Sequence, residues 1–196
     1  MTQQRGMGLR LWVLVAALCA GCSTAPSRFY RLASTARPDG TAPAHEPIIV
    51  GPVTVPGGVD RPQIVVQVAP NRVQLDDFNR WEAPLGESIA RVVAGNLAVL
   101  LDNPDIATAP LANFKAAYRV TIDVQSFDSM QGDAAFVDAV WAVHNIASGK
   151  TRSGRTQARE AVSGPGFEAL AAAHSQALAQ VSADIAAALR AAQAER

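Results

Sequence analysis

Tyr118-Arg119-Val120-Thr121-Ile122-Asp123-Val124-Gln125 is the stretch that decides the fold class of this chain. Its apolar residues alternate with polar ones without a break. This period of two places the apolar side chains on one face of a β-strand and the polar ones on the other. Residues 118–125 therefore predict a strand with one face in a core and the other in water.

Two more strands are expected downstream. Residues 136–143 are apolar on both faces except for Asp138, which is typical of a central strand covered on both sides. Gly149 marks a turn, and the polar residues 151–162 favour a strand at or near the sheet edge.

Two segments carry apolar side chains at helical spacing. The first follows Pro84, which suits the first turn of a helix, and its stripe consists of Leu85, Ile89, Val92, Val93, Leu97, Leu100 and Leu101. The second follows Gly164-Pro165-Gly166, and its stripe consists of Phe167, Leu170, His174, Leu178, Val181, Ile185 and Leu189. Each stripe covers one side of its helix, so both helices are expected to pack against the sheet.

Upstream of the first helix the sequence predicts further strands. Residues 48–55 form a β-branched run that contains Gly51-Pro52, and because proline cannot donate to a ladder we expect a bulge or an edge position there. Residues 63–68 and 72–75 are expected to be strands, and residues 76–84 a loop that leads into the helix. Residues 106–109 favour one more short strand.

Strands, helix, strands and helix thus follow one another along the chain. This order indicates the α+β class, with a largely antiparallel or mixed sheet and two main helices packed on one face. A single domain is expected over residues 48–193, because a chain of this length suffices for one core.

The N-terminus has the pattern of a secretory signal. Arg5 and Arg10 give it a positive charge, and residues 11–20 are uncharged and end in small residues. Ten such residues are too few for a membrane span, which needs about 20. Residues 1–21 are therefore expected to be removed as a signal peptide.

The cysteine that follows, Cys22, defines the start of the mature chain. Small residues before a cysteine resemble the bacterial lipoprotein signal, although Cys19 stands where that pattern usually has leucine. The resemblance implies N-acyl and S-diacylglycerol lipid on Cys22, and Ser23 after it resembles an outer-membrane address. Residues 22–47 are expected to form a lipidated tether with a short first strand near 29–32. An ordinary secreted protein with a chance cysteine is the alternative.

Charge and cysteine content narrow the functions further. Removal of residues 1–21 takes two of the 17 basic residues and none of the 17 acidic ones, which leaves a net charge of −2. No basic patch is implied, so nucleic acid is not an expected partner. With Cys19 removed and Cys22 acylated, the mature chain has no thiol for a disulfide, a nucleophile or a metal.

Motifs for catalysis are absent from the sequence. It contains no glycine-rich phosphate loop, no His-Glu-x-x-His and no nucleophile elbow. His174 lies in an apolar stripe, which favours a core histidine over a general base, and Asp76-Asp77 favours a solvated turn over a metal site. We therefore expect no catalytic residue, no metal and no cofactor beyond the lipid, and hence not an enzyme.

Two stretches stand out as candidate interaction sites. Asp60 and Arg61 precede a proline, and Arg80, Trp81 and Glu82 precede the first helix. One interpretation is structural: Asp60 or Glu82 forms an ion pair with Arg61 or Arg80 and locks two loops together. The other is a docking face, because tryptophan and arginine are frequent in binding hot spots.

Several segments in order carry a resemblance to a known family. They are Gly51-Pro52-Val53 with Pro56, Asp60-Arg61-Pro62-Gln63-Ile64-Val65, Arg80-Trp81-Glu82-Ala83-Pro84-Leu85, Tyr118-Arg119-Val120 through Phe127-Asp128, and Ala139-Val140-Trp141. Together they resemble the auxiliary lipoproteins of ABC-type intermembrane transport systems, the paraquat-inducible PqiC type. Gly57-Gly58-Val59 departs from the bulkier turn of such relatives.

This resemblance implies a docking or receiving component on the periplasmic face of the outer membrane. The implied partner is a periplasmic mammalian-cell-entry (MCE) protein, and the implied cargo is lipid or another hydrophobic molecule, in support of envelope integrity. A homo-oligomeric ring is left open. Two alternatives remain: a lipoprotein that assembles the envelope or activates a cell-wall synthase, and a lipid-binding shuttle with a cavity between helices and sheet.

Overall fold

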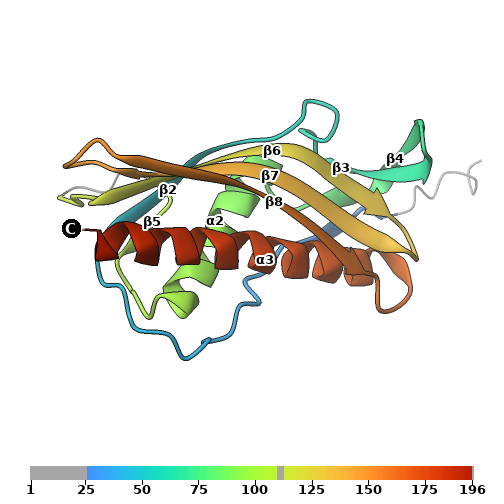
Figure 1. Ribbon diagram of the computed structural model, residues 1–196. Coiled ribbons are helices and arrows are strands. Elements are labelled where there is room, and N and C mark those ends of the chain that lie inside the picture. Colours follow the sequence, from blue (N-terminus) through green and yellow to red (C-terminus); the bar gives the residue numbers. More distant parts are fainter. Residues whose placement is uncertain (1–25, 110–112, 196) are drawn as a thin grey trace, which may run out of the picture.

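The computed structural model describes residues 26–109 and 113–195 (Figure 1). The expected signal peptide 1–21 and the lipid site Cys22 lie outside the described residues. The elements are β1 (Arg28–Tyr30), β2 (Ile48–Thr54), β3 (Gln63–Ala69), β4 (Arg72–Trp81), α2 (Leu85–Leu100), β5 (Ile106–Ala107), β6 (Tyr118–Met130), β7 (Ala134–Asn145), β8 (Thr151–Ala161) and α3 (Gly166–Ala194).

The strands form one mixed, curled sheet. β6, β7 and β8 make an antiparallel meander, and β3 pairs with β4 in an antiparallel hairpin. β2 runs parallel to β6, β1 runs parallel to β4, and β3 meets β6 at a single pair, Val66 and Ser129. The α+β prediction is confirmed, and so is the edge position of β8, which pairs only with β7.

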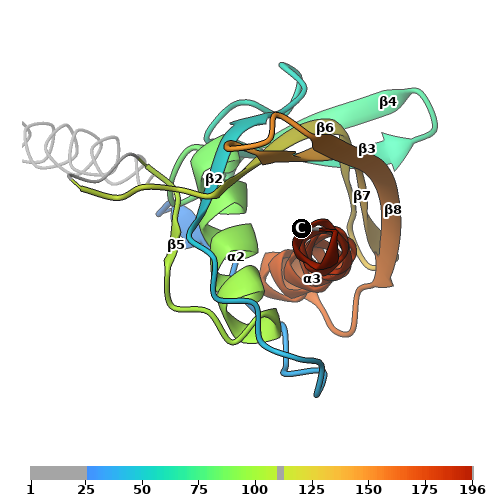
Figure 2. The ribbon, with the colours of Figure 1, turned by 60° about the vertical axis from the view of Figure 1, so that its left-hand side comes forward.

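α3 lies inside the curl of the sheet and α2 packs beside it, as Figure 2 shows. The sequence of α3 permits this position inside the curl. Its buried face alternates large side chains with alanine and serine, which let a helix approach a sheet closely. Leu170, Leu178, Val181, Ile185 and Leu189 are fully buried there. The core thus fills the space between helices and sheet.

Asp138 is the charged residue that interrupted the apolar pattern of β7. Its side chain is buried and accepts hydrogen bonds from Arg155 Nε (2.8 Å) and Gln157 Nε2 (3.0 Å) of β8. The hydrogen bond from Arg155 is the main cause that lowers the pKa of Asp138. A carboxylate is tolerated in this central strand because β8 supplies its partners.

β2 contains the expected bulge. Its register against β6 shifts between Val50 and Val53, on either side of Gly51-Pro52. β2 is not an edge strand, because it lies between β6 and the two residues of β5.

The segment before α2 differs from the sequence prediction. Residues 76–84 were expected as a loop, yet β4 continues to Trp81. The pairing of β4 with β3 is irregular between Leu75 and Arg80. Asp76 stabilises this part of the strand, because its Oδ1 accepts hydrogen bonds from the backbone N–H groups of Phe78 (3.0 Å) and Asn79 (2.8 Å). Beyond it, the three residues of β1 pair with Asn79–Trp81 and extend the ladder.

The segment expected as a tether contains the short first strand that was predicted near 29–32, and its remaining described part also packs on the domain. β1 begins at Arg28, and the following residues pack along the helices, with Leu32 and Ala44 buried. Long-range hydrogen bonds hold the segment there. Asn96 Oδ1 on α2 accepts from Ser34 Oγ (2.7 Å), Thr35 N (3.0 Å) and Ala36 N (3.0 Å). Ser175 Oγ on α3 accepts from Ala33 N (3.1 Å), and Asn103 Nδ2 donates to the carbonyl of Ala44 (2.8 Å). The described part of residues 22–47 therefore lies on the domain instead of standing off from it.

Candidate functional site

The two stretches singled out by the sequence meet in one shallow hollow. It has a volume of about 370 Å³ and is lined by Phe29, Asp60, Arg61, Pro62, Arg80, Trp81, Glu82, Ala83 and Pro84. We call it the Arg61–Arg80 hollow. It lies where β1, the end of β4 and the start of α2 come together.

Backbone hydrogen bonds hold the two stretches side by side. The N–H of Trp81 donates to the carbonyl of Pro62 (2.7 Å), and the N–H of Glu82 donates to the carbonyl of Tyr30 (2.9 Å). The preceding turn is closed by the N–H groups of Val59 and Asp60, which both donate to Pro56. Rigid backbone thus presents the side chains of this hollow.

The predicted ion pairs are wrong in their partners. Glu82 pairs with Arg31 (2.7 Å) and more loosely with Arg91 (3.6 Å), two residues that the sequence analysis did not consider. The hydrogen bond from Arg31 is the main cause that lowers the pKa of Glu82. The reason is topological: β1 runs beside β4, so an arginine 51 residues away lies nearer than Arg80, the neighbour in sequence.

Two guanidinium groups of the hollow remain without an acidic partner. Among the described residues no ion pair includes Arg61 or Arg80. Arg80 Nε donates only to the carbonyl of Asp77 (3.1 Å), and Arg61 is exposed. Two carboxylates also line the hollow, but that of Glu82 is paired with Arg31, which leaves two guanidinium groups against the carboxylate of Asp60. The site therefore offers positive charge to an external group.

Trp81 is a core residue and not a docking residue. Only 5% of it is exposed, and its ring lies edge-on to Phe127 (6.0 Å between centroids) and to His174 (6.1 Å). The exposed aromatic side chain at this hollow is Phe29, 64% exposed, which lies in the short first strand expected near 29–32. Its neighbour Tyr30 packs on Phe167 instead, as expected from the alternation of a strand.

His174 is the core histidine that the sequence predicted. It is completely buried, stacks on Phe127 (3.9 Å between centroids, 6° between planes), and its Nε2 lies 2.8 Å from Ser129 Oγ. Its Nδ1 has no partner among the described residues. Burial lowers the pKa of His174 to about 3, so the ring stays neutral at physiological pH.

This histidine makes stability depend on pH. In the unfolded chain a histidine has a pKa of about 6.5, so between pH 6.5 and 3 the unfolded state binds a proton that the folded state excludes, and stability falls as the pH falls. The protein should be about 2 kcal/mol less stable at pH 5 than at pH 8. Urea unfolding of His174→Gln should show a flatter pH dependence than that of the wild type. Equal slopes in the two proteins would contradict a buried neutral His174.

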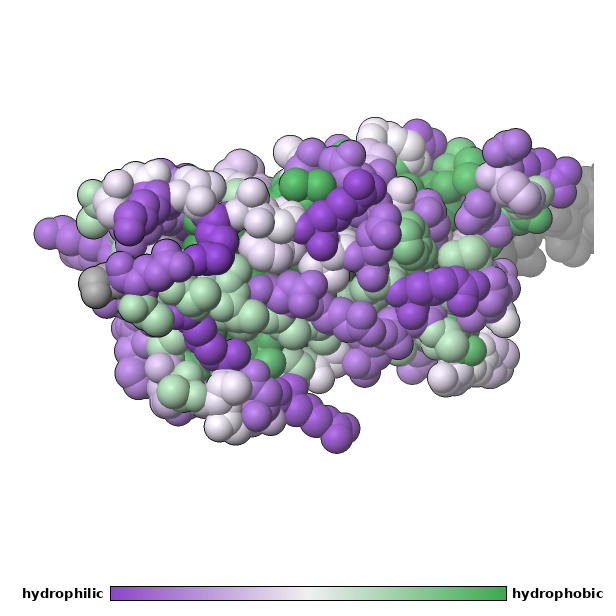
Figure 3. All heavy atoms as spheres, in the orientation of Figure 1, coloured by the Kyte–Doolittle hydropathy of each residue, from purple (hydrophilic) through white to green (hydrophobic). Residues whose placement is uncertain are grey.

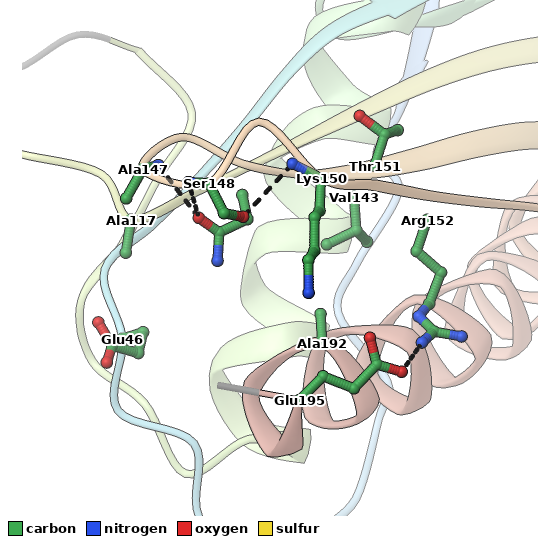
Figure 4. Close-up of a pocket in the computed structure, with 11 residues that line it drawn as sticks. Glu46, Ala117, Val143, Ala147, Ser148, Lys150, Thr151, Arg152, Ala192 and Glu195 are labelled. Atoms are coloured by element: carbon green, nitrogen blue, oxygen red, sulfur yellow. Dashed lines mark hydrogen bonds and ion pairs between the residues drawn. The ribbon is translucent and has the colours of Figure 1, made fainter.

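A larger hollow of about 980 Å³ lies at the opposite end of α3 (Figure 4). It is lined from β7, β8, the turn between them and the end of α3, and its charged residues are Glu46, Lys150, Arg152 and Glu195. Arg152 forms an ion pair with Glu195 across its rim. The positive charge of this larger hollow is therefore partly neutralised by an ion pair, whereas Arg61 and Arg80 of the other hollow have no ion pair among the described residues.

Two features are absent from the part of the chain that the structure describes. No group of three or more His, Cys, Asp or Glu side chains there is placed to hold a metal ion. No helix there combines the length and the apolar character that crossing a membrane requires.

Comparison with known proteins gives one family and a shared fold. Residues 30–186 match the family described as "ABC-type transport auxiliary lipoprotein component". No curated protein matches the chain. A solved structure from Xanthomonas campestris, of family DUF330, matches with a TM-score of 0.71 and 20% identity, covering 86% of this chain and 98% of that one.

Two other solved structures are similar to a lesser degree. An uncharacterized protein matches with a TM-score of 0.69 and 19% identity, covering 84% of this chain and 99% of that one. The PelC dodecamer from Paraburkholderia phytofirmans reaches a TM-score of 0.39 and 15% identity, covering 73% of this chain and 91% of that one, which is too weak to support any argument.

Proposed function

Because the chain belongs to the family of ABC-type transport auxiliary lipoprotein components, we propose that it is a lipid-anchored docking component of an intermembrane transport system. The resemblance found in the sequence is confirmed at the level of this family. In the proposal, acylated Cys22 holds the domain on the periplasmic face of the outer membrane. There it receives a periplasmic MCE protein that carries lipids or other hydrophobic molecules.

The observation that carries this proposal is the Arg61–Arg80 hollow. It places two guanidinium groups without acidic partners beside Phe29, whose side chain is 64% exposed. Arginine and aromatic side chains around a shallow pocket are the usual composition of a binding hot spot. The complementary partner surface is acidic with an apolar side chain that fits against Phe29.

The test removes the two guanidinium groups without touching the core. Arg61→Ala/Arg80→Ala should weaken capture of the MCE protein of the same transport system by about thirtyfold or more, since each lost arginine contact in a hot spot costs at least about 1 kcal/mol and two are lost. The melting temperature should stay within a few degrees of wild type, because neither side chain is in an ion pair. Binding is measured with purified partners at physiological salt.

Arg152→Ala is the matched control at the opposite hollow. It removes an exposed arginine of the 980 Å³ hollow and should leave capture unchanged. If Arg152→Ala weakens capture and the Arg61→Ala/Arg80→Ala variant does not, the docking face is at the other end of the molecule and this assignment fails.

Photo-crosslinking in living cells distinguishes this proposal from the alternative functions that the sequence left open. A photo-crosslinking residue at Arg61 should capture an MCE protein; capture of a cell-wall synthase would favour the envelope-assembly alternative. The filled space around Leu170, Leu178 and Ile185 counts against a lipid-binding shuttle. A homo-oligomeric ring stays part of the proposal, and native mass spectrometry of the full chain tests it.

A further inference from the structure

Exposed apolar side chains gather at one end of the molecule. Eight large apolar residues are exposed among residues 26–109 and 113–195, and five of them lie on β1 or on the β3–β4 hairpin. Phe29 belongs to the hollow described above. The other four, Val68 (41% exposed), Val73 (62%), Leu75 (44%) and Phe78 (43%), form what we call the hairpin patch.

The hairpin patch lies on a part of the sheet that projects from the body. β3 pairs with β6 only at Val66, and β1 pairs with β4 only from Asn79 onward. Between these points, residues 67–78 have no further strand on either side in the described chain. Figure 1 shows the β3–β4 hairpin extending past the helices, and Figure 3 shows apolar side chains over this end. Apolar side chains on a projecting hairpin mark an interaction surface.

Chain length places the lipid anchor at the same end. Five residues lie between Cys22 and Arg28, and these six steps along the chain place the anchor at most about 22 Å from the start of β1. β1 is fixed in turn, because Arg28 is in register with Asn79 of β4. From Asn79 to Arg72 the hairpin spans about 23 Å. The hairpin patch is therefore within reach of the bilayer surface that holds the anchor.

The charges around the patch fit an interfacial position. Arg28 and Arg72 are exposed at this end and can extend to lipid phosphates while their aliphatic stems stay on apolar surface. Asp76 is occupied by the backbone donors of Phe78 and Asn79, so Asp77 is the acidic side chain of the hairpin that faces the solvent freely. Apolar contact dominates this surface, and two arginines flank it.

We propose that Val73, Leu75 and Phe78 of the β3–β4 hairpin insert into the headgroup region of the bilayer to which Cys22 is attached. This inference rests on the proposed lipid anchoring and adds an orientation to it. α3 of 29 residues spans about 43 Å, so the hollow at its C-terminal end then points away from the membrane. In this orientation the Arg61–Arg80 hollow lies next to the bilayer. A carrier protein docked there would stand at the membrane surface that receives the carrier's cargo.

A fluorescent label on full-length, lipidated protein tests this orientation. The mature chain has only the acylated Cys22, so Leu75→Cys introduces a single thiol for an environment-sensitive probe. In liposomes of phosphatidylethanolamine and phosphatidylglycerol, spin-labelled lipid should quench this probe about threefold more than a probe at Ile146→Cys, because interfacial segments sit several ångströms deep in the headgroup region. Ile146 is matched in exposure (45% against 44%) and lies at the opposite end of α3.

The outcomes separate the two proposals. If wild-type protein does not float with liposomes, the lipid anchor fails and this inference falls with it. If the protein floats but both probes are quenched equally, only the orientation is wrong. If the probe at Leu75→Cys shifts to the blue without quenching by lipid, a second copy covers the hairpin and the bilayer does not. Val73→Cys, at a position 62% exposed, repeats the measurement should the first variant fold poorly.

Discussion

Trp81→Ala is expected to lower the free energy of unfolding by about 3–5 kcal/mol, the usual cost of truncating a large buried aromatic side chain. Trp81 is 5% exposed and stands edge-on to both Phe127 and His174, which stack on each other. Truncation would leave a cavity bordered by two rings that cannot collapse into it, because each is fixed by the other. Urea unfolding monitored by circular dichroism at pH 8 measures the loss.

Phe29→Ala is the matched control for this prediction. Phe29 lines the same hollow but is 64% exposed, so its truncation should change stability by less than about 0.5 kcal/mol. A loss below 1 kcal/mol for Trp81→Ala would show that the ring is not part of the core. A variant that removes Trp81 together with Arg80 would mix a folding defect with a surface change, so the docking test uses Arg61 and Arg80.

Local periodicity explains what the sequence could predict. The alternation over residues 118–125 and the stripes of the two helices depend only on residues a few positions apart, and the structure has β6, α2 and α3 there. β4 was predicted too short because its register against β3 shifts between Val65 and Gln63, which breaks the period of two. The carboxylate of Asp76 stabilises this irregular part of β4, but in the sequence Asp76 was interpreted as part of a solvated turn.

The sequence singled out the two stretches that form the candidate site, but it did not show which of their side chains are buried, paired or exposed. The stretches around Arg61 and Arg80 do meet, because the hairpin of β3 and β4 returns the chain to Pro62. Which side chain faces the core could not be known, since the irregular register of β4 decides that Trp81 points inward. Arg31 and Phe29 were missed because the parallel pairing of β1 with β4 leaves no local pattern.

The position of the segment expected as a tether also depends on long-range contacts, and Asn96 makes three of its hydrogen bonds. Asn96 is fully buried in the middle of α2, and its Oδ1 accepts from one hydroxyl and two backbone N–H groups of residues 34–36. Its Nδ2 donates to Ser182 Oγ on α3 (3.1 Å). A composition rich in proline, alanine and serine indicates flexibility. Here Asn96 ties residues 34–36 to the helices, and Ser175 and Asn103 add further hydrogen bonds to Ala33, Ala44 and Glu46.

Asn96→Ala should therefore cost about 2–4 kcal/mol and loosen residues 31–47 before the rest of the domain unfolds, because removing an acceptor leaves its donors unsatisfied. Hydrogen–deuterium exchange should show the amides of Thr35 and Ala36 exchanging at least about thirtyfold faster, which corresponds to a loss of about 2 kcal/mol. Ser182→Ala is the control: it removes the partner of Nδ2 and leaves the three bonds to Oδ1 in place, so exchange at Thr35 and Ala36 should stay as in wild type. If exchange at these two amides is unchanged in Asn96→Ala, contacts such as those of buried Leu32 and Ala44 hold the segment, and the amide is not what ties residues 34–36 to the domain.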